Sequence, residues 1–161
     1  MLTQAILKEL YYYDKYNGIF TRIKRCGKLL PNSKVGCQNL KDSYLRLKIN
    51  KKYYLLHRLA WMYVHGQFPI KFIDHIDGNK LNNSIENLRL VTKSENAQNI
   101  KKPHKDNKTG YLGVYLHLSG LYGSRICLNG KSKSLGYYKI PYDAHVAYLK
   151  AKRIMHPMST I

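Results

Sequence analysis

Four side chains between residues 74 and 96 belong to the types that proton transfer and metal binding require. Asp74 supplies a hard carboxylate oxygen and Asn96 an amide oxygen, and oxygen ligands with room for water suit Mg²⁺ rather than zinc. His75 is neutral near pH 7 and can take a proton. Asn87 can accept a hydrogen bond from the other nitrogen of that ring and fix its tautomer. The four residues therefore predict a general base beside a metal ion.

The local sequence predicts a strand, a loop, a second strand and a helix around these side chains. Short apolar segments at 71–75 and 87–91 are typical of strands, and "IDGNKLNN" between them contains an Asp-Gly turn. Thr92 and Glu95 form a capping box that opens a helix through about residue 101. An antiparallel strand pair followed by a helix can bring the four side chains to one place. The loop residues Asn79, Asn82 and Asn83 are interpreted most simply as turn residues.

The adjacency of Asp74 and His75 has a chemical use. Neighbours at the end of a strand project in different directions, so a phosphodiester between them could meet a metal on one side and a base on the other. In-line attack by water requires that arrangement. Taken alone, an Asp-His pair is more often an ordinary polar contact than a catalytic pair.

The charge of the chain indicates its partner. Among 161 residues, 28 are Lys or Arg and 9 are Asp or Glu, which gives a formal net charge of +19. This excess implies a polyanion; nucleic acid is the leading candidate, and an anionic membrane surface would also fit. No apolar run approaches the roughly 18 residues of a spanning helix, and no signal-peptide pattern opens the chain. Three scattered cysteines without a CxxC pair exclude a four-Cys zinc site and favour reduced thiols in a cytoplasm.

The organisation predicted for the chain is α+β, in three segments and a linker. Residues 1–56 favour a helix capped by Thr3 and then strands with a hairpin turn at Asn17-Gly18. The basic surface of this segment packs on the central segment or lies along DNA. Residues 57–100 hold a helix that ends at Gly66 and then the strand, loop, strand and helix described above. Residues 101–109, "KKPHKDNKT", are typical of a basic linker. Residues 110–161 predict three strands and a helix, with a hairpin turn at "NG" and a helix opening at a proline.

The central segment resembles a known family. "DHIDGNKLNN…ENLRLVTKSEN", preceded by "LLHRLAW", closely resembles the HNH endonucleases of phage and intron origin, from about His57 to Asn99. Their fold is two strands and a helix around one metal ion, the ββα-metal core. Many members end the motif with His, and this chain has Asn96 there, as does a branch of phage homing nucleases.

The resemblance assigns roles to the residues named above. It implies His75 as the general base and Asn87 as its orienting residue. It implies Asp74 and Asn96 as ligands of one Mg²⁺, or of another divalent ion such as Mn²⁺. His57 matches the His of the upstream "HRL" and is interpreted as structural or as lying near the DNA backbone.

The C-terminal segment resembles a second family. "NKTGYLGVYLH…LNGKSKSLGYYKIPYDAHVAYLKAKRIMHP" is similar to the AP2-type DNA-binding domain, which lays a three-stranded sheet in the major groove with a helix behind it. Tyr122 stands where that family usually has Trp. The expected outward side chains are Tyr115, His117, Arg125, Lys131 and Lys133. All the residues expected to contact DNA are Arg58, Lys80, Arg89, Lys93, Tyr115, His117, Arg125, Lys131, Lys133 and Tyr137.

Of three functions compatible with the sequence, the first is favoured because Asp74, His75, Asn87 and Asn96 are all intact. The first is a metal-dependent endonuclease acting on double-stranded DNA, of phage or mobile-element type, working as a monomer or weak dimer away from membranes. The second is a catalytically inactive DNA-binding protein on an HNH scaffold. The third is an RNA-binding protein, which the 15 tyrosines permit. Only the first should make a covalent change in the strand that is lost when EDTA removes the metal.

Overall fold

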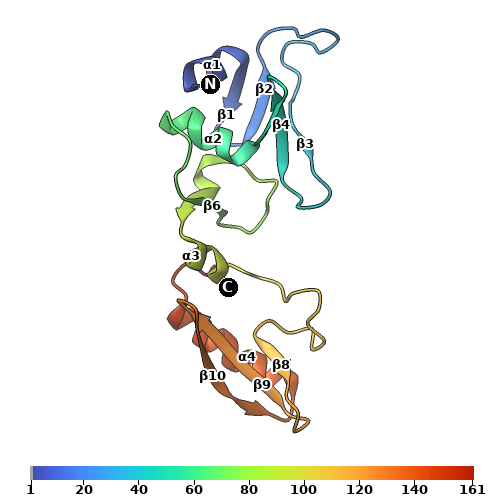
Figure 1. The fold of residues 1–161 in the computed structure, drawn as a ribbon, viewed down its shortest axis with the longest axis vertical. Helices are drawn as coiled ribbons and strands as arrows, with labels where there is room; N and C mark the ends of the chain where they lie inside the picture. The colour runs from blue at the N-terminus through green and yellow to red at the C-terminus, as the bar shows by residue number, and fades with distance from the viewer. Residues whose placement is uncertain (1) are drawn as a thin grey trace. The chain divides into compact units, whose positions relative to one another are not determined.

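The computed structural model describes residues 2–161, which form two compact units, residues 2–91 and residues 92–161 (Figure 1). The division falls after Val91, inside the segment 57–100 that the sequence predicts as one module. Both strands of that segment therefore belong to the first unit, together with the N-terminal residues. The helix that opens the segment also belongs to the first unit, and the helix that follows the strands belongs to the second.

The first unit contains three small antiparallel sheets and two α-helices. The first sheet pairs β1 (Tyr11–Asp14) with β2 (Ile19–Arg22), and the second has the order β3 (Cys37–Gln38), β4 (Leu45–Ile49), β5 (Lys52–Leu55). The third pairs β6 (Phe72–His75) with β7 (Leu88–Val91). The helices are α1 (Gln4–Leu10) and α2 (Leu56–His65), and one 3₁₀ turn, η1 (Ile85–Asn87), precedes β7.

Local signals in the sequence account for the bounds of several of these elements. Thr3 caps α1 by accepting a hydrogen bond from the backbone N–H of Ile6 at 3.3 Å. Gly66 ends α2 in the left-handed region, with φ of 86°. The predicted hairpin turn at Asn17-Gly18 joins β1 to β2, with Asp14 paired to Ile19. These features of the prediction are confirmed.

One apolar core joins the N-terminal segment to the strand pair β6–β7. A two-stranded sheet is marginally stable by itself in water, so this pair depends on what packs against it. Ile73 from β6 and Leu88 from β7 lie in the same buried cluster as side chains from α1, β1, β2, β4 and α2. The members of the cluster are Leu7, Tyr11, Tyr13, Phe20, Leu47, Ile49, Leu56, Leu59, Ala60, Met62, Ile73 and Leu88.

The β1–β2 hairpin also holds the loop between β6 and β7. The Tyr13 hydroxyl donates to the Asn83 carbonyl at 2.6 Å, and the Lys15 carbonyl accepts from the Ile85 backbone N–H at 3.0 Å. Gly18 lies directly against this loop, because a Cβ added there would stand 2.3 Å from the Asn83 carbonyl carbon. The hairpin turn and the loop are therefore in backbone-to-backbone contact.

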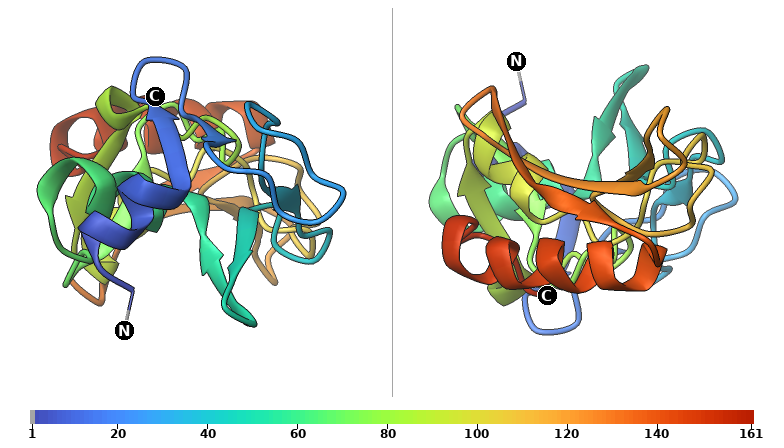
Figure 2. Two further views of the ribbon diagram at one scale, coloured as in Figure 1. Left: turned by 90° about the horizontal axis from the view of Figure 1, so that it is seen from above. Right: turned by 90° about the horizontal axis from the view of Figure 1, so that it is seen from below.

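The second unit is a three-stranded sheet with a helix on one face. Its strands are β8 (Val114–Leu116), β9 (Tyr122–Leu128) and β10 (Lys131–Tyr138), in the order β10-β9-β8. Helix α4 (Pro141–Met155) runs along one face of that sheet (Figure 2) and buries Ala144 and Tyr148. The short helix α3 (Lys93–Gln98) opens the unit with the predicted capping box. The predicted Asn129-Gly130 turn and the proline at the first turn of α4 are also confirmed.

Replacing Gly18 with alanine tests the contact between hairpin and loop. The backbone φ of +68° is strained for alanine, and the added methyl group would overlap the Asn83 backbone. We expect Gly18→Ala to lower the free energy of unfolding by about 2–5 kcal/mol, from strain and overlap together, in urea denaturation followed by the fluorescence of the single tryptophan, Trp61.

The matched control is Gly27→Ala, because Gly27 has a φ of +57° with no atom within 4 Å of an added Cβ. It should cost only the strain of the left-handed backbone, about 1–2 kcal/mol. An equal decrease in the free energy of unfolding of the two variants would mean that the hairpin turn is not in close contact with the loop.

Candidate active site

The candidate active site lies at the end of β6, where two consecutive polar residues are both buried. Asp74 is 8% exposed and His75 is 3% exposed. In the antiparallel pair, Asp74 stands opposite Arg89 and His75 opposite Leu88. Directly opposed residues of antiparallel strands share a face, so each buried polar group has a defined neighbour on β7.

Asp74 is neutralised by that neighbour. The Arg89 Nε and Nη2 atoms donate to Asp74 Oδ2 at 2.9 and 2.7 Å. A buried carboxylate requires such a partner, because removing a charge from water without one is costly. Arg89 was predicted to contact DNA, and in the structure its guanidinium instead stabilises the carboxylate that was predicted to bind a metal.

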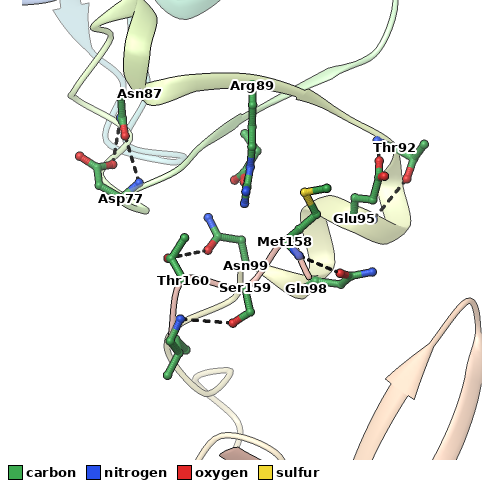
Figure 3. A network of polar contacts seen from close by, with 12 residues as sticks. Asp77, Asn87, Arg89, Thr92, Glu95, Gln98, Asn99, Met158, Ser159 and Thr160 are labelled. Carbon is green, nitrogen blue, oxygen red and sulfur yellow. Dashed lines mark hydrogen bonds and ion pairs between the residues drawn. The ribbon is translucent and has the colours of Figure 1, made fainter. Parts of the chain in front are cut away.

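The loop between the strands supplies the hydrogen-bond partner of His75. Its Nε2 atom lies 3.2 Å from the side-chain oxygen of Asn83, and Asn83 is only 1% exposed. The sequence predicted that Asn87 would hold the ring. Asn87 instead accepts from the Asp77 backbone N–H at 3.0 Å and donates to the Asp77 carboxylate and the Asn82 carbonyl (Figure 3).

The structure therefore gives the two asparagines different tasks. Asn87 hydrogen-bonds to Asp77 and Asn82 within the loop, and Asn83 hydrogen-bonds to the His75 imidazole. Sequence reasoning missed Asn83 because it lies in a run of turn-forming residues. No signal in the local sequence could have identified it, because its burial comes from tertiary contacts.

Burial and local hydrogen bonds set the charge states in this loop. Burial lowers the pKa of His75 below its ordinary value, although the Asn83 hydrogen bond and the Asp77 and Asp74 carboxylates act in the opposite direction. His75 is therefore neutral at pH 7 and able to take a proton. Burial alone would raise the pKa of Asp77, but hydrogen bonds from Asn82, the Asn79 backbone and Asn87 outweigh it, and this pKa is lowered.

A second histidine and a tyrosine pack against His75. The His57 ring meets the His75 ring edge-on with centroids 5.2 Å apart, and the Tyr44 ring lies 5.0 Å from His57. Burial, with lesser effects from His75 and Arg58, lowers the pKa of His57 to about 3. His57 is therefore an uncharged packing partner at neutral pH, which fits the structural role predicted for it.

Two further residues that were predicted to contact DNA brace the first unit. Lys80 donates to the Asp42 carbonyl at 3.1 Å and lies 4.7 Å from the centre of the Tyr44 ring. Arg58 donates to the Pro69 carbonyl at 2.9 Å, which ties α2 to the segment that follows it. Lys80 remains exposed, so bracing the loop leaves its charge accessible to solvent.

The predicted ligands carry oxygen atoms of the kind that bind a divalent ion. Within residues 2–161, no group of three or more His, Cys, Asp or Glu side chains could hold a metal. Asp74 is nevertheless a carboxylate, the hard oxygen donor that Mg²⁺ prefers. The other predicted ligand, Asn96, is exposed on α3 in the second unit.

Contacts within the second unit fix the surroundings of Asn96. Thr92 and Glu95 form the reciprocal hydrogen bonds of the capping box (Figure 3), and the Asn96 backbone N–H donates to the Thr92 carbonyl. At the end of α3, Gln98 accepts from the Met158 backbone and Asn99 from the Thr160 hydroxyl. Helix α3 is thereby tied to the C-terminal residues.

The open face of the second unit carries a cluster of aromatic and basic side chains. Tyr115 and Tyr137 are side-chain hydrogen-bond partners, and the Arg125 guanidinium lies 4.9 Å from the centre of the Tyr115 ring. The His117 ring meets Tyr137 edge-on at 4.8 Å. Gly123 makes room for this cluster, because a Cβ there would stand 2.4 Å from the Tyr115 ring. We call these four side chains the open-face cluster.

Strand register separates Lys131 and Lys133 from the open-face cluster. Lys133 is paired with Ile126 and Lys131 with Leu128. Ile126 is 1% exposed and alternates with Arg125 along β9, so the two lysines share the face opposite Arg125. The sequence predicted all three cations on one face, and the register contradicts that part of the prediction.

A groove beside this sheet carries further positive charge. It encloses about 1030 Å³, and its walls include Lys93, Lys108 and Arg125. Tyr148 and His156 from α4 and its end also contribute to its lining. Lys93, which was predicted to contact DNA, is therefore exposed at a groove of the second unit.

Comparisons with known proteins match the segment around the candidate active site. Residues 54–98 match the family model described as HNH endonuclease. The chain is 44% identical over 59 residues to protein 3.8 of Escherichia phage T7, across 36% of this chain and 48% of that protein. It is 43% identical over 60 residues to YosQ of the SPbeta prophage of Bacillus subtilis (strain 168), whose name includes the words HNH homing endonuclease, across 37% and 35% of the two chains.

A third relative comes from a virus of amoebae. An HNH endonuclease of Acanthamoeba polyphaga mimivirus, named as uncharacterized, is 44% identical over 57 residues, across 34% of this chain and 29% of that protein. The matches therefore span about half or less of each curated relative. No solved structure matches the chain.

These matches confirm the resemblance of the central segment to HNH endonucleases. The family match ends at residue 98, so the AP2-like character of residues 110–161 stays a prediction. Among residues 2–161, the structure has no helix that is both long and apolar enough to span a membrane.

The burial of His57 predicts how the first unit responds to acid. The folded unit keeps His57 neutral down to about pH 3, whereas the unfolded chain protonates a histidine near pH 6.5. Between these values the unfolded state binds the extra proton, so stability falls as the pH falls. We expect the free energy of unfolding, followed by Trp61 fluorescence, to depend more steeply on pH in the wild type than in His57→Gln.

The control for this measurement is His104→Gln, which removes an exposed histidine of the second unit. Its pH dependence should parallel that of the wild type. Parallel curves for His57→Gln and the wild type would contradict the assignment of a buried neutral imidazole.

Proposed function

We propose that this protein is a metal-dependent endonuclease that hydrolyses phosphodiester bonds in double-stranded DNA. The observation that carries the proposal is the HNH match over residues 54–98, coinciding with a neutral, hydrogen-bonded His75 beside a buried Asp74. Phage, prophage and viral relatives favour a mobile-element enzyme of the homing type. A monomer or weak dimer in the cytoplasm of the host is the simplest arrangement.

In the proposed reaction His75 is the general base. A water molecule beside the scissile phosphate loses a proton to the imidazole as its oxygen bonds to phosphorus, and the bond from phosphorus to the leaving oxygen breaks. The leaving oxygen then takes a proton from solvent. Asp74 would be a ligand of Mg²⁺ or Mn²⁺, which when bound stabilises the negative charge on the phosphate and the leaving oxygen.

The residues around this base prepare it for that step. Burial keeps the imidazole neutral, so its lone pair is available for a proton at physiological pH. Arg89 compensates the negative charge of the Asp74 carboxylate where water is scarce.

Binding of the duplex is assigned to the basic second unit. The open-face cluster combines a guanidinium with two tyrosine rings on an exposed sheet, which is chemistry suited to reading a groove or contacting phosphates. An AP2-like use of the sheet would place Tyr115, Arg125 and Tyr137 against DNA. The net charge of +19 supplies an affinity that is strong and dependent on salt.

One observation favours a second function. Because Arg89 donates twice to Asp74 Oδ2, the carboxylate is already paired within the protein. A chain that keeps this pair on DNA would be a DNA-binding protein on an HNH scaffold, without cleavage. Catalysis and its metal dependence separate the two functions.

Replacing His75 with alanine tests the proposed function. Loss of a general base reduces turnover by about 100-fold or more, while affinity for DNA should remain close to that of the wild type because His75 is buried. Single-turnover cleavage and filter binding of the same DNA measure both quantities. A collapse of binding together with cleavage would identify His75 as structural and contradict the mechanism.

Two variants that remove one charge each test the assignment of the open face. Arg125→Gln and Lys133→Gln leave the same net charge, but only Arg125 lies on the open face. We expect Arg125→Gln to weaken DNA binding more, and to reduce the slope of log K against log salt concentration by about one. Equal losses in the two variants would contradict binding through that face.

A further inference from the structure

We propose that Asn83 is a positioning residue for His75 and that the β1–β2 hairpin holds it in place. Its side-chain oxygen accepts the hydrogen of His75 Nε2, so the neutral ring carries its proton on Nε2 and its lone pair on Nδ1. The structural part of this inference concerns the free protein. Its catalytic consequence rests on the proposed function, because the base in that reaction would be Nδ1.

The amide orientation of Asn83 follows from its second hydrogen bond. Asn83 Nδ2 donates to the Leu81 carbonyl at 3.4 Å, and a carbonyl can only accept. The side-chain oxygen is therefore the atom that faces the imidazole, at 3.2 Å from Nε2. An oxygen that faces a neutral ring nitrogen requires a hydrogen on that nitrogen. The contact thus selects one tautomer.

Burial of both side chains strengthens the preference for this tautomer. Asn83 is 1% exposed and His75 is 3% exposed, so water cannot replace the amide at Nε2. A buried acceptor left without a donor costs about 1–3 kcal/mol, and the tautomer with its hydrogen on Nδ1 would leave two lone pairs facing each other. A surface asparagine could not impose this preference.

The position of the Asn83 backbone is set from a segment 70 residues earlier. The Tyr13 hydroxyl donates to the Asn83 carbonyl at 2.6 Å, and Tyr13 is itself fixed by stacking on Phe20 at 4.5 Å. The Lys15 carbonyl accepts from the Ser84 hydroxyl at 3.2 Å. The absence of a side chain at Gly18 permits this approach.

These contacts assign a role in the site to the N-terminal segment. Residues 1–56 were predicted to pack on the central segment or to lie along DNA. The β1–β2 hairpin packs on the central segment and reaches the candidate base through one intermediate residue. Removing the Tyr13 hydroxyl while keeping its ring should therefore disturb the position of Asn83, and through it the tautomer of His75.

The direct test is the tautomer of His75 in the full-length chain without DNA or metal. Imidazole ¹⁵N shifts at pH 7.5 distinguish a protonated nitrogen from one with a lone pair, and comparison with His75→Gln assigns the signals among the seven histidines. We expect the wild type to carry the hydrogen on Nε2. Asn83→Ala should give a mixture of tautomers, and Tyr13→Phe a smaller shift in the same direction.

Two further variants separate positioning from general destabilisation. Asn83→Asp keeps an oxygen acceptor and should retain the hydrogen on Nε2. Asn82→Ala removes a neighbouring loop hydrogen bond to Asp77 without touching the ring, and should leave the wild-type tautomer. A hydrogen on Nδ1 in the wild type, or a tautomer that Asn83→Ala leaves unchanged, would overturn the proposal. If Asn83→Ala fails to fold, Tyr13→Phe decides, and an unchanged tautomer there overturns the role of the hairpin.

Cleavage kinetics supply the second measurement. Asn83→Ala should lower kcat by about 10-fold or more with little change in KM, and Asn83→Asp should recover part of it. If cleavage proves independent of His75, the proposed function fails, whereas the tautomer measurement still tests the contact with Asn83. The two failures are therefore distinguishable.

Discussion

The structure of the first unit depends on one constraint, the burial of two adjacent polar side chains at the end of a two-stranded sheet. Asp74 and His75 are both less than one-tenth exposed, and a strand pair of four residues each cannot shield or stabilise them by itself. Each group therefore has a specific partner. Arg89 across the sheet compensates the carboxylate, and Asn83 in the loop accepts from the imidazole.

The position of Asn83 depends on contacts from the rest of the first unit. Asn83 can reach His75 only if its loop is fixed, and the fixing contacts come from Tyr13, Lys15 and Gly18 in the first hairpin. That hairpin is held in turn by the apolar core it shares with Ile73 and Leu88. The N-terminal segment and strands β6 and β7 are thus one folding unit, and the proposed chemistry is located where its core ends.

Features set by local sequence could be predicted, and features set by distant contacts could not. The Thr92–Glu95 capping box, the two Asn-Gly turns and the end of α2 at Gly66 follow from neighbours within a few residues. The Asn83 contact depends on Tyr13, 70 positions away, and no local pattern encodes it. The sheet face on which Lys133 lies could, in contrast, have been predicted. A two-residue turn pairs Leu128 with Lys131, and counting residues from that pair along the hairpin gives the face of Lys133.

Strand scission that depends on a metal is the central claim, and one measurement tests it most directly. Purified protein is incubated with supercoiled plasmid in Mg²⁺, in Mn²⁺ and in EDTA, and the plasmid forms are separated on a gel. The account predicts conversion to open circle or linear DNA with a divalent ion and none in EDTA. Tight binding without scission under every divalent ion and DNA tried would contradict it, and would leave the Asp74–Arg89 pair as the permanent state of a DNA-binding protein.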